Sequence, residues 1–450
     1  MSKYLNDVIE GVRVRHANEP EFVQTVEEVL SSLGPVIDKH PEYEKVDLLN
    51  RMVEPERMFT FRVTWMDDAG QWHTNRGWRC QFNGAIGPYK GGLRFQKNVY
   101  EGIIKFLGFE QTFKNSLTGL PMGGGKGGSD FDPAGKSDAE VMRFCQAYMT
   151  ALYRYIGPDI DVPAGDMGVG GREIGYLFGQ YRRLKGVWEN GVLTGKGLSY
   201  GGSLIRPEAT GYGAVYYLCE VLKHENDSIE GKRIAVSGYG NVAWGIMKKA
   251  AELGAKVTYM SGPDGYVHDP EGITTEEKLN FILKMRAEDP MHCKPYADKF
   301  GCEFVAGTKA WGAKDVDIVM PSAMQNDVTM EWAEKIAASG IKYYIEVANM
   351  PTTNDALNFL REQKHIIVAP SKAVNAGGVG VSGLEMAQNS ERLVWTAEEV
   401  DAQLKKMMKN IHDASAAAAE EYGLGYDLVA GGNIAGFKKV AEAMMAQGCF

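Results

Sequence analysis

The 450-residue chain lacks the features that mark membrane, secreted and metal-dependent proteins. No apolar run approaches the ~18 residues that cross a bilayer. Asp7, Glu10 and Glu19 interrupt the N-terminal segment, which therefore has no apolar block of the kind that a secretory signal requires. The six cysteines form no CxxC pair and no HExxH motif is present, so we expect reduced structural thiols and no metal site. These absences predict a cytoplasmic protein that does not bind a membrane.

Positive charge is also scarce. Lys and Arg total 49 against 58 for Asp and Glu, which leaves a formal net charge of −9 at pH 7. No run of basic residues forms a stripe that could follow a phosphate backbone, so we expect no nucleic-acid partner. The composition, with 44% hydrophobic and 24% charged residues, is that of a globular protein, and the length accommodates two or three domains of ~100–200 residues.

Glycine, by contrast, is abundant, at 54 of 450 residues. Much of it falls in clusters at 84–92, 119–128, 165–171, 195–202, 238–245 and 377–383. Glycine is favoured where the backbone takes positive φ or approaches a ligand, so several such loops indicate one built cleft. Turn chemistry alone accounts equally well for any single cluster. The stretch 195–202 is also a candidate hinge, because the hydrophobic pattern changes after it.

The hydrophobic pattern predicts an α/β fold in two parts. Before residue 200, a helix over 21–33 is followed by a β-hairpin whose strands cover 59–65 and 72–82. After residue 200, short apolar strands alternate with helices, which is typical of a doubly wound sheet. The strands are expected at Ile234–Ser237, Lys256–Met260, Ile318–Met320, Tyr343–Glu346 and Ile366–Ala369. Two amphipathic helices follow residue 396 and close the chain.

A dinucleotide-binding motif, GYGNVA at 238–243, stands between a predicted strand and a predicted helix. In that position the glycines permit a tight turn, and a pyrophosphate can approach the helix N-terminus closely. We therefore expect a bound nicotinamide or flavin dinucleotide, with the cofactor-binding residues Gly238, Gly240, Asn241 and Val242. The alternative is a glycine-rich turn without a ligand.

The end of the next strand bears on which dinucleotide is bound. A carboxylate about 20 residues after the motif usually holds the adenosine ribose of NAD, and Asp264 lies close to that place. No Lys or Arg lies between Ser261 and Pro270 to pair with the 2′-phosphate of NADP. These residues favour NAD and leave NADP open.

Two other motifs fail on spacing. Around Gly125 and Lys126, the phosphate-binding loop of nucleotide triphosphatases would need a glycine where Leu120 stands and a Ser or Thr where Gly127 stands. Around Ser382, the nucleophile elbow of serine hydrolases would need a second glycine at an offset where the chain has none.

Three lysines and one aspartate lie in sequence contexts that make them candidate functional residues. Lys90 and Lys126 are flanked by glycines in predicted loops, whereas Lys114 fits an ordinary solvated helix equally well. Asp166 lies on a tight apolar loop, where an unpaired carboxylate is costly, so we expect a cationic partner. A structural salt bridge or an Asx-turn would explain Asp166 as well.

Together these segments resemble a known family. The stretch LPMGGGKGGSDFDP at 120–133 is similar to the active-site lysine signature of the glutamate dehydrogenases. Five further segments of this chain resemble the other motifs of that family, in the same order: PYKGGLRF, PAGDMGVG, RPEATGYG, GYGNVA and KAVNAGGVGVSG. The resemblance covers essentially the whole chain and is closest to the hexameric bacterial enzymes, including the NAD-linked clostridial type.

This resemblance implies an architecture and an assembly. A substrate-binding and oligomerisation domain is expected over residues 1–200, with the C-terminal helix at 425–450 returning to it. A Rossmann-like dinucleotide-binding domain is expected over 201–424, with the active-site cleft between the two domains. A homohexamer is also implied.

Carried over residue by residue, the resemblance implies that Lys126 is the catalytic lysine and Asp166 the carboxylate that transfers protons. The chemistry of amino-acid oxidation agrees. Loss of hydride from the α-carbon leaves an iminium that water must attack; a lysine can activate that water while a carboxylate moves protons to and from nitrogen. The lysine must have a pKa below its reference value of ~10.4, which burial and a second cation would produce.

The resemblance also implies binding residues. Gln111, Lys114 and the backbone of Gly165 correspond to the α-carboxylate end of the substrate. Lys90 and Ser382 correspond to the anchors of the side-chain carboxylate, with Val379 packing on the methylenes. Further cofactor contacts are implied for Thr210, Asn241, Asn349 and Asn375.

The predicted activity is reversible NAD(P)-dependent deamination of L-glutamate to 2-oxoglutarate and ammonium. In the related branched-chain and aromatic amino-acid dehydrogenases, apolar residues occupy the positions of Lys90 and Ser382, so this pair favours glutamate. A monocarboxylic substrate of the leucine or phenylalanine type is the first alternative, which Lys90 and Ser382 disfavour. The second is a non-catalytic dinucleotide-binding regulator, which the presence of Lys126 and Asp166 disfavours.

Overall fold

The chain divides into two compact units. The computed structural model describes residues 2–448. Unit 1 comprises residues 2–204, 379–400 and 433–448, and unit 2 comprises residues 205–378 and 401–432. The sequence analysis assigned 379–400 to the dinucleotide-binding domain, whereas these residues pack within unit 1. The boundaries at 378/379 and 400/401 fall inside the helices Ala376–Glu391 and Ala397–Glu421, so no change in the hydrophobic pattern marks the points where the chain passes from one unit to the other.

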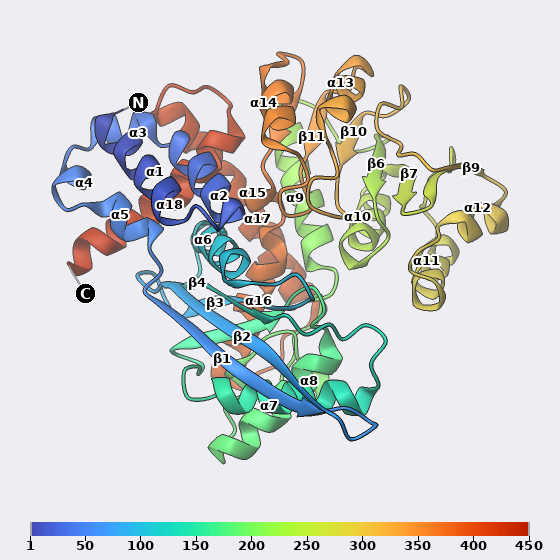
Figure 1. The fold of residues 1–450 in the computed structure, drawn as a ribbon. Helices are drawn as coiled ribbons and strands as arrows, with labels where there is room; N and C mark the ends of the chain where they lie inside the picture. Colours follow the sequence, from blue (N-terminus) through green and yellow to red (C-terminus); the bar gives the residue numbers. More distant parts are fainter. Residues whose placement is uncertain (1, 449–450) are drawn as a thin grey trace. The chain divides into compact units, whose positions relative to one another are not determined.

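Unit 1 is built on a mixed sheet, of which β1 to β4 are labelled in Figure 1. The strand order is β1-β2-β4-β3-β5. Its strands are β1 (Arg57–Met66), β2 (Trp72–Asn83), β3 (Tyr89–Phe95), β4 (Gly123–Ser129) and β5 (Asp161–Gly165). β1 and β2 pair antiparallel, as the sequence predicted. β4 runs antiparallel to β2 and parallel to β3, and β3 is parallel to β5.

Helices cover both faces of this sheet. α7 (Asp138–Leu152) and α8 (Gly171–Lys185) bury one face around an aromatic core, in which Phe131 and Phe144 stack with ring centroids 3.7 Å apart. α6 (Glu101–Leu117) packs on the other face, where a Cβ added at Gly108 would lie 3.4 Å from Cys80 Sγ of β2. Burial on both sides makes the central strands apolar except where they carry functional side chains.

β4 accounts for the densest glycine cluster. All of its residues are buried. A Cβ at Gly124 would lie 1.9 Å from Thr112 Oγ1 on α6, and one at Gly128 would lie 2.3 Å from the carbonyl oxygen of Arg94 on β3. These neighbours leave no room for a side chain, so only glycine fits. The prediction of a ligand-binding loop over 119–128 was therefore wrong, because most of this cluster is a buried strand.

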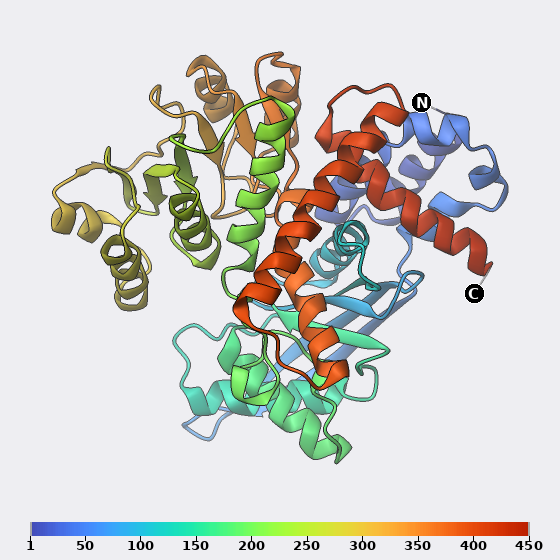
Figure 2. The same cartoon turned by 180° about the vertical axis from the view of Figure 1, so that it is seen from behind.

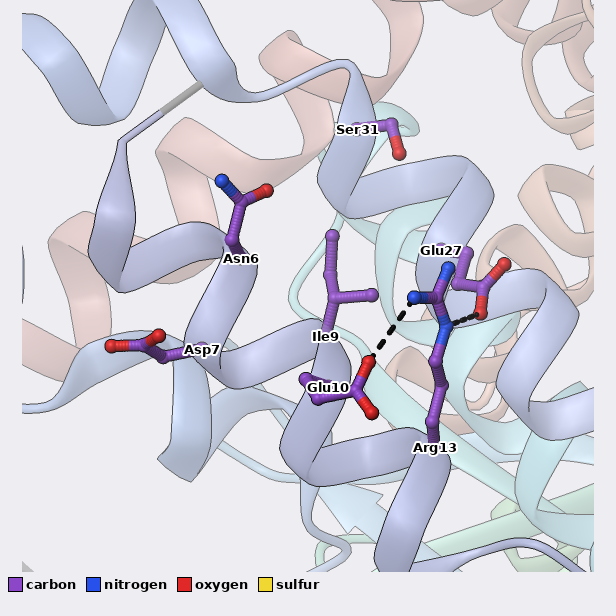
Figure 3. Close-up of a pocket in the computed structure, with 7 residues that line it drawn as sticks. All are labelled: Asn6, Asp7, Ile9, Glu10, Arg13, Glu27 and Ser31. Carbon is purple, nitrogen blue, oxygen red and sulfur yellow. Dashed lines mark hydrogen bonds and ion pairs between the residues drawn. The ribbon is translucent and has the colours of Figure 1, made fainter.

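Short helices precede the hairpin: α1 (Lys3–Arg15), α2 (Pro20–Ser31), α3 (Gly34–Lys39), α4 (Glu42–Lys45) and α5 (Leu48–Val53). α2 confirms the predicted helix and begins at Pro20, a residue suited to the first helical position. A hollow between α1 and α2 is spanned by Arg13, whose Nε lies 2.6 Å from Glu27 Oε1 (Figure 3). Arg13 forms a second ion pair with Glu10, in which Arg13 Nη1 lies 3.2 Å from Glu10 Oε2. The charges in this hollow are thus paired, and we assign no site to it.

Unit 2 contains a seven-stranded sheet of order β12-β11-β10-β6-β7-β8-β9. Its strands are β6 (Arg233–Ser237), β7 (Lys256–Gly262), β8 (Gly265–His268), β9 (Glu303–Ala306), β10 (Ile318–Met320), β11 (Tyr343–Ile345) and β12 (Ile367–Ala369). The five predicted strands are all present and pair in parallel. β8 and β9, which the sequence analysis did not predict, extend the sheet as antiparallel strands. The doubly wound α/β class is confirmed.

The helices of unit 2 precede, connect or follow these strands in the chain (Figure 2). They are α9 (Ala209–His224), α10 (Asn241–Glu252), α11 (Glu276–Glu288), α12 (Lys294–Phe300), α13 (Met330–Ala338), α14 (Asn354–Glu362) and α15 (Ser371–Val374). α9 and α10 approach closely, since a Cβ at Gly211 would lie 2.4 Å from the carbonyl oxygen of Val242. The start of the cofactor-motif helix is thereby held against α9.

Three C-terminal helices carry the chain between the units: α16 (Ala376–Glu391), α17 (Ala397–Glu421) and α18 (Leu428–Gln447). The prediction of a glycine-rich loop over 377–383 was wrong, because these residues are the first turns of α16. Within unit 2, a Cβ at Gly377 would lie 2.5 Å from the carbonyl oxygen of Ala209, so packing against α9 requires this glycine. Among residues 2–448, no helix has both the length and the apolar character needed to cross a membrane.

Candidate active site

Unit 1 brings the predicted lysine and aspartate into direct contact. Lys126 lies on β4 and Asp166 directly follows β5. Lys126 Nζ is 3.0 Å from Asp166 Oδ2, and the same oxygen accepts a 2.8 Å hydrogen bond from Arg94 Nε on β3. The expectation that Asp166 has a cationic partner is confirmed, and Arg94 is a second partner that the sequence analysis missed.

The electrostatic setting of this pair suits proton transfer. Burial lowers the pKa of Lys126 below its usual value, and the charges of Arg94 and Arg79 lower it further against the opposing effect of Asp166. Burial alone would raise the pKa of Asp166, but Lys126 and Arg94 outweigh it and hold that pKa well below its usual range. Lys126 therefore loses its proton more readily than an exposed lysine, while Asp166 stays ionised.

A second buried lysine lies on the neighbouring strand. Lys90 on β3 is 1% exposed, and its Nζ donates a 2.9 Å hydrogen bond to Thr194 Oγ1. The backbone of Thr194 donates in turn to the carbonyl oxygen of Pro163 on β5. Thr194 is fully buried and was missed by the sequence analysis, because a threonine in a loop carries no recognisable signal. The prediction that Lys90 stands on a loop was wrong, since it belongs to a buried strand.

α6 carries two further predicted substrate residues, Gln111 and Lys114. Gln111, Lys114 and Asn115 share one helix face by their spacing. Gln111 Nε2 donates to Asn115 Oδ1 at 2.6 Å, and Asn115 Nδ2 donates to the carbonyl oxygen of Lys90 at 3.0 Å. Lys114 is half-buried. α6 is thereby fixed to the strand that carries Lys90, and Asn115 is a connecting residue that sequence reasoning did not identify.

The remaining predicted substrate residues also belong to unit 1. Gly165 ends β5, next to Asp166. Val379 and Ser382 lie on α16, where Ser382 is 1% exposed and Val379 is half-buried. Ser382 thus lies within the packed interior of the unit.

Unit 2 contains a cavity of about 1020 Å³ at the predicted dinucleotide motif. The turn between β6 and α10 forms one wall, and Gly238, Gly240, Asn241 and Val242 all line the cavity. Gly238 has a φ of +79°, a left-handed conformation that favours glycine. A Cβ at Gly240, the N-cap of α10, would meet no protein atom within 4 Å. The motif therefore presents open backbone at a helix N-terminus.

The position of Asp264 does not fit the ribose-binding role that the sequence analysis considered for it. Its carboxylate accepts hydrogen bonds from the backbone nitrogen atoms of Cys293 and Lys294, at 3.0 and 3.2 Å, and it is not among the residues lining the cavity. Burial would raise the pKa of Asp264, but these bonds outweigh it and lower the pKa. The geometry thus gives Asp264 a structural role at the start of α12.

Two polar residues that the sequence analysis missed do line the cavity. Nη1 of Arg286 on α11 is buried and has no hydrogen-bond partner, and burial lowers the pKa of Arg286. Oδ2 of Asp327 is likewise buried without a partner, while Oδ1 accepts a 2.6 Å hydrogen bond from Lys309. Arg286 comes from outside the window of sequence in which a cofactor-binding cation was sought.

The other predicted cofactor residues lie elsewhere in unit 2. Asn375 Nδ2 donates to Asn349 Oδ1 and to the carbonyl oxygen of Val347, each at 2.9 Å, and Asn375 Oδ1 is buried without a partner. Thr210 lies in the first turn of α9. The structure thus brings Asn349 and Asn375 together, and neither they nor Thr210 line the cavity at the motif.

A unit in which a buried lysine pairs with a partly buried aspartate, and a unit with a cavity at a dinucleotide-binding motif, define the class of two-domain, nicotinamide-linked dehydrogenases. Residues 201–448 match the model of the Glutamate/Leucine/Phenylalanine/Valine dehydrogenase family, and residues 55–183 match the Glu/Leu/Phe/Val dehydrogenase dimerisation domain. The chain belongs to this family of oxidoreductases.

Individual relatives are similar over their full length. The NAD-specific glutamate dehydrogenase of Clostridium symbiosum is 69% identical over 448 residues, which cover 100% of this chain and 99% of the relative. The NADP-specific glutamate dehydrogenase of Psychrobacter sp. is 50% identical, with 99% of each chain covered. A solved glutamate dehydrogenase is 69% identical, covers 100% of both chains and superimposes with a TM-score of 0.99. These similarities confirm the family and enzyme class predicted from the motifs.

Proposed function

We propose that this chain catalyses the reversible oxidative deamination of L-glutamate to 2-oxoglutarate and ammonium with NAD(P). The ion pair between buried Lys126 and Asp166 carries the proposal, since it supplies a lysine of lowered pKa beside an ionised carboxylate. The same unit holds a further buried cation, Lys90. A dicarboxylate needs a cation for each of its ends, and unit 1 contains both Lys90 and Lys114.

Different residues of unit 1 would bind the two ends of the substrate. Lys114, Gln111 and the backbone of Gly165 would hold the α-carboxylate end of the substrate. Lys90 and Ser382 would hold the side-chain carboxylate, with Val379 packing on the methylenes between. Hydrogen bonds between ionised partners are about twice as strong as neutral ones, so the two lysines would contribute most of the orientation.

The same geometry supports a route for protons. When bound, the nicotinamide accepts a hydride from the α-carbon, which leaves the substrate as an iminium. Lys126 in its neutral form then takes a proton from the water that attacks the iminium carbon. Asp166 passes protons to and from the nitrogen until ammonia leaves. The 3.0 Å separation of Lys126 Nζ and Asp166 Oδ2 lets the two groups exchange a proton directly.

The residues of unit 2 fit a dinucleotide. The open backbone at Gly240 and the N-terminus of α10 suit a pyrophosphate. The unpartnered Nη1 of Arg286 offers a donor to an anion, and the unpartnered Oδ2 of Asp327 offers an acceptor to a hydroxyl group. The free oxygen of Asn375 can accept from an amide, as in a nicotinamide carboxamide. We propose NAD as the cofactor, with NADP as a second candidate because both specificities occur among relatives.

We further propose that the enzyme is a cytoplasmic homohexamer. Support comes from the match of residues 55–183 to a dimerisation domain. The motifs also resemble most closely those of hexameric bacterial enzymes. Multi-angle light scattering of the purified chain tests the assembly, and a mass other than that of six chains would refute it.

Following the absorbance of reduced nicotinamide with the purified protein tests the proposed reaction. We expect turnover of glutamate to exceed that of leucine and phenylalanine, and Lys126→Arg and Asp166→Ser to lose nearly all of it. Faster turnover of a monocarboxylic amino acid would favour the first alternative. Binding of NAD without turnover of any amino acid would indicate a regulator.

A further inference from the structure

A buried ion pair lies next to the side-chain end of the proposed substrate site. Lys196 and Glu385 have fully buried side chains, with Nζ and Oε1 2.7 Å apart. Burial lowers the pKa of Lys196, and Glu385 opposes that effect. Removing two charges from water costs several kcal/mol per ion, so a hydrophobic pair would serve stability as well. The ion pair therefore calls for an explanation other than stability.

The hydrogen bonds of this pair fix one loop. Glu385 accepts from the backbone nitrogen of Gly195 at 2.9 Å and from that of Lys196 at 3.3 Å. Lys196 Nζ donates to the carbonyl oxygen of Leu193 and to Asn389 Oδ1. Both carboxylate oxygens and the ammonium group are thus engaged with loop 193–196 or with α16. Gly195 has a φ of +85°, so the loop turns sharply at that residue.

Thr194 lies inside the loop that these bonds hold. Its hydroxyl accepts the hydrogen bond from Lys90 Nζ. On α16, Ser382, Glu385 and Asn389 follow at intervals of three and four residues and therefore share one helix face. The face of α16 that anchors the loop is the face that carries Ser382. The ion pair thus fixes the loop bearing Thr194 against the helix bearing Ser382.

We propose that Lys196 and Glu385 are positioning residues, which set Thr194 and Ser382 around Lys90 and so determine the preference for an amino acid with a carboxylate at the end of its side chain. This rests on the proposed function. In this proposal neither residue contacts the substrate. They act through Thr194, which accepts the hydrogen bond from Lys90, and through the helix that carries Ser382. Their loss therefore weakens binding of the second carboxylate without changing the chemistry at the α-carbon.

The test compares two substrates in the purified, full-length enzyme. L-Glutamate carries the second carboxylate, whereas L-norvaline keeps the five-carbon chain and has a methyl group in its place. The variant Lys196→Met/Glu385→Gln removes both charges together, which avoids the large destabilisation caused by leaving one buried charge unpaired. The matched control is Lys105→Met/Glu19→Gln, since Lys105 and Glu19 form a mostly buried pair elsewhere in unit 1.

In the double variant we expect KM for glutamate to rise about tenfold or more, the effect of losing one charge-assisted hydrogen bond. We expect kcat for glutamate, KM for NAD and kcat/KM for norvaline to stay within about twofold, so that the preference for glutamate falls about tenfold. The control variant should keep the wild-type preference.

Equal losses of kcat/KM for both substrates, or an unchanged preference, would overturn the positioning role and leave a structural pair. If the double variant fails to fold, Thr194→Val removes the same acceptor from Lys90 and must reproduce the loss of preference. A wild-type enzyme that does not oxidise glutamate refutes the proposed function before any variant is measured.

Discussion

Arg79 and Asp161 form an ion pair from which solvent is fully excluded. Arg79 lies on β2 and Asp161 begins β5, two strands that are separated in the sheet by β4 and β3. Arg79 Nε donates to Asp161 Oδ2 at 2.9 Å, and Nη1 donates to the carbonyl oxygen of Gly91 on β3 at 3.0 Å. One guanidinium thereby ties β2, β3 and β5 together across the strand that carries Lys126.

Neutralising one member of this pair should destabilise unit 1. The variant Asp161→Asn leaves Arg79 buried without its counter-charge, so we expect a loss of about 3–5 kcal/mol in the free energy of unfolding. Urea unfolding at fixed protein concentration measures this loss of free energy. Hydrogen exchange of the sheet amides is then measured as a second experiment. The control is Asp7→Asn, whose exposed partner Lys3 predicts a change below about 1 kcal/mol. Similar values for the two variants would contradict the assignment.

Arg94 should set the pH at which Lys126 becomes a base. Arg94 lowers the pKa of Lys126 and shares Asp166 with it. In Arg94→Gln the pKa of Lys126 rises, so a higher pH is needed to form the neutral amine. We expect the rising limb of the kcat/KM profile for deamination to move to higher pH. Arg143→Gln, at an exposed ion pair of α7, should leave the profile in place. A downward shift in Arg94→Gln would refute the explanation.

The glycines of β4 should be intolerant of any side chain. In Gly124→Ala the added Cβ would lie 1.9 Å from Thr112 Oγ1 and 2.7 Å from Thr112 Cα, so α6 must move away. We expect this overpacking to cost about 1–3 kcal/mol or more. Gly179→Ala on α8, where a Cβ meets nothing within 4 Å, should instead stabilise by about 0.5–1 kcal/mol. Thermal unfolding of both variants measures the contrast, and a stable Gly124→Ala protein would show that the strand can accommodate a side chain.

Arg286 should contribute to dinucleotide binding. Its buried Nη1 has no partner, and a bound anion would satisfy it. In Arg286→Met we expect Kd for NAD to rise about tenfold, the effect of one charge-assisted hydrogen bond. Titration calorimetry with NAD, NADP and AMP measures this without turnover. Lys284→Met on the same helix, at an exposed lysine, is the control. Unchanged binding of all three ligands in Arg286→Met would remove Arg286 from the site.

The hydrophobic pattern predicted much of unit 2. The positions of its five parallel strands agree with those observed to within one or two residues, because each strand is a short apolar run between helical segments. The glycine clusters were harder to interpret. The clusters at 119–128 and 377–383 were predicted to be loops, yet residues 123–129 form a strand and residues 376–391 form a helix. Glycine density reports close approach of the backbone, and sequence alone does not say whether a ligand or a neighbouring helix makes that approach.

The amino-acid sequence by itself determined the α/β class, the dinucleotide motif and the family, because ordered motifs and local periodicity need no knowledge of distant contacts. Lys126, Asp166 and Lys90 could also be selected from it. Only the tertiary structure decided their partners: Arg94 and Arg79 beside Lys126, Thr194 on Lys90, and Arg286 in the cavity. Those partners come from strands, loops and helices far apart in the chain. Electrostatic interactions depend on distance and burial, which exist only once these segments have packed together.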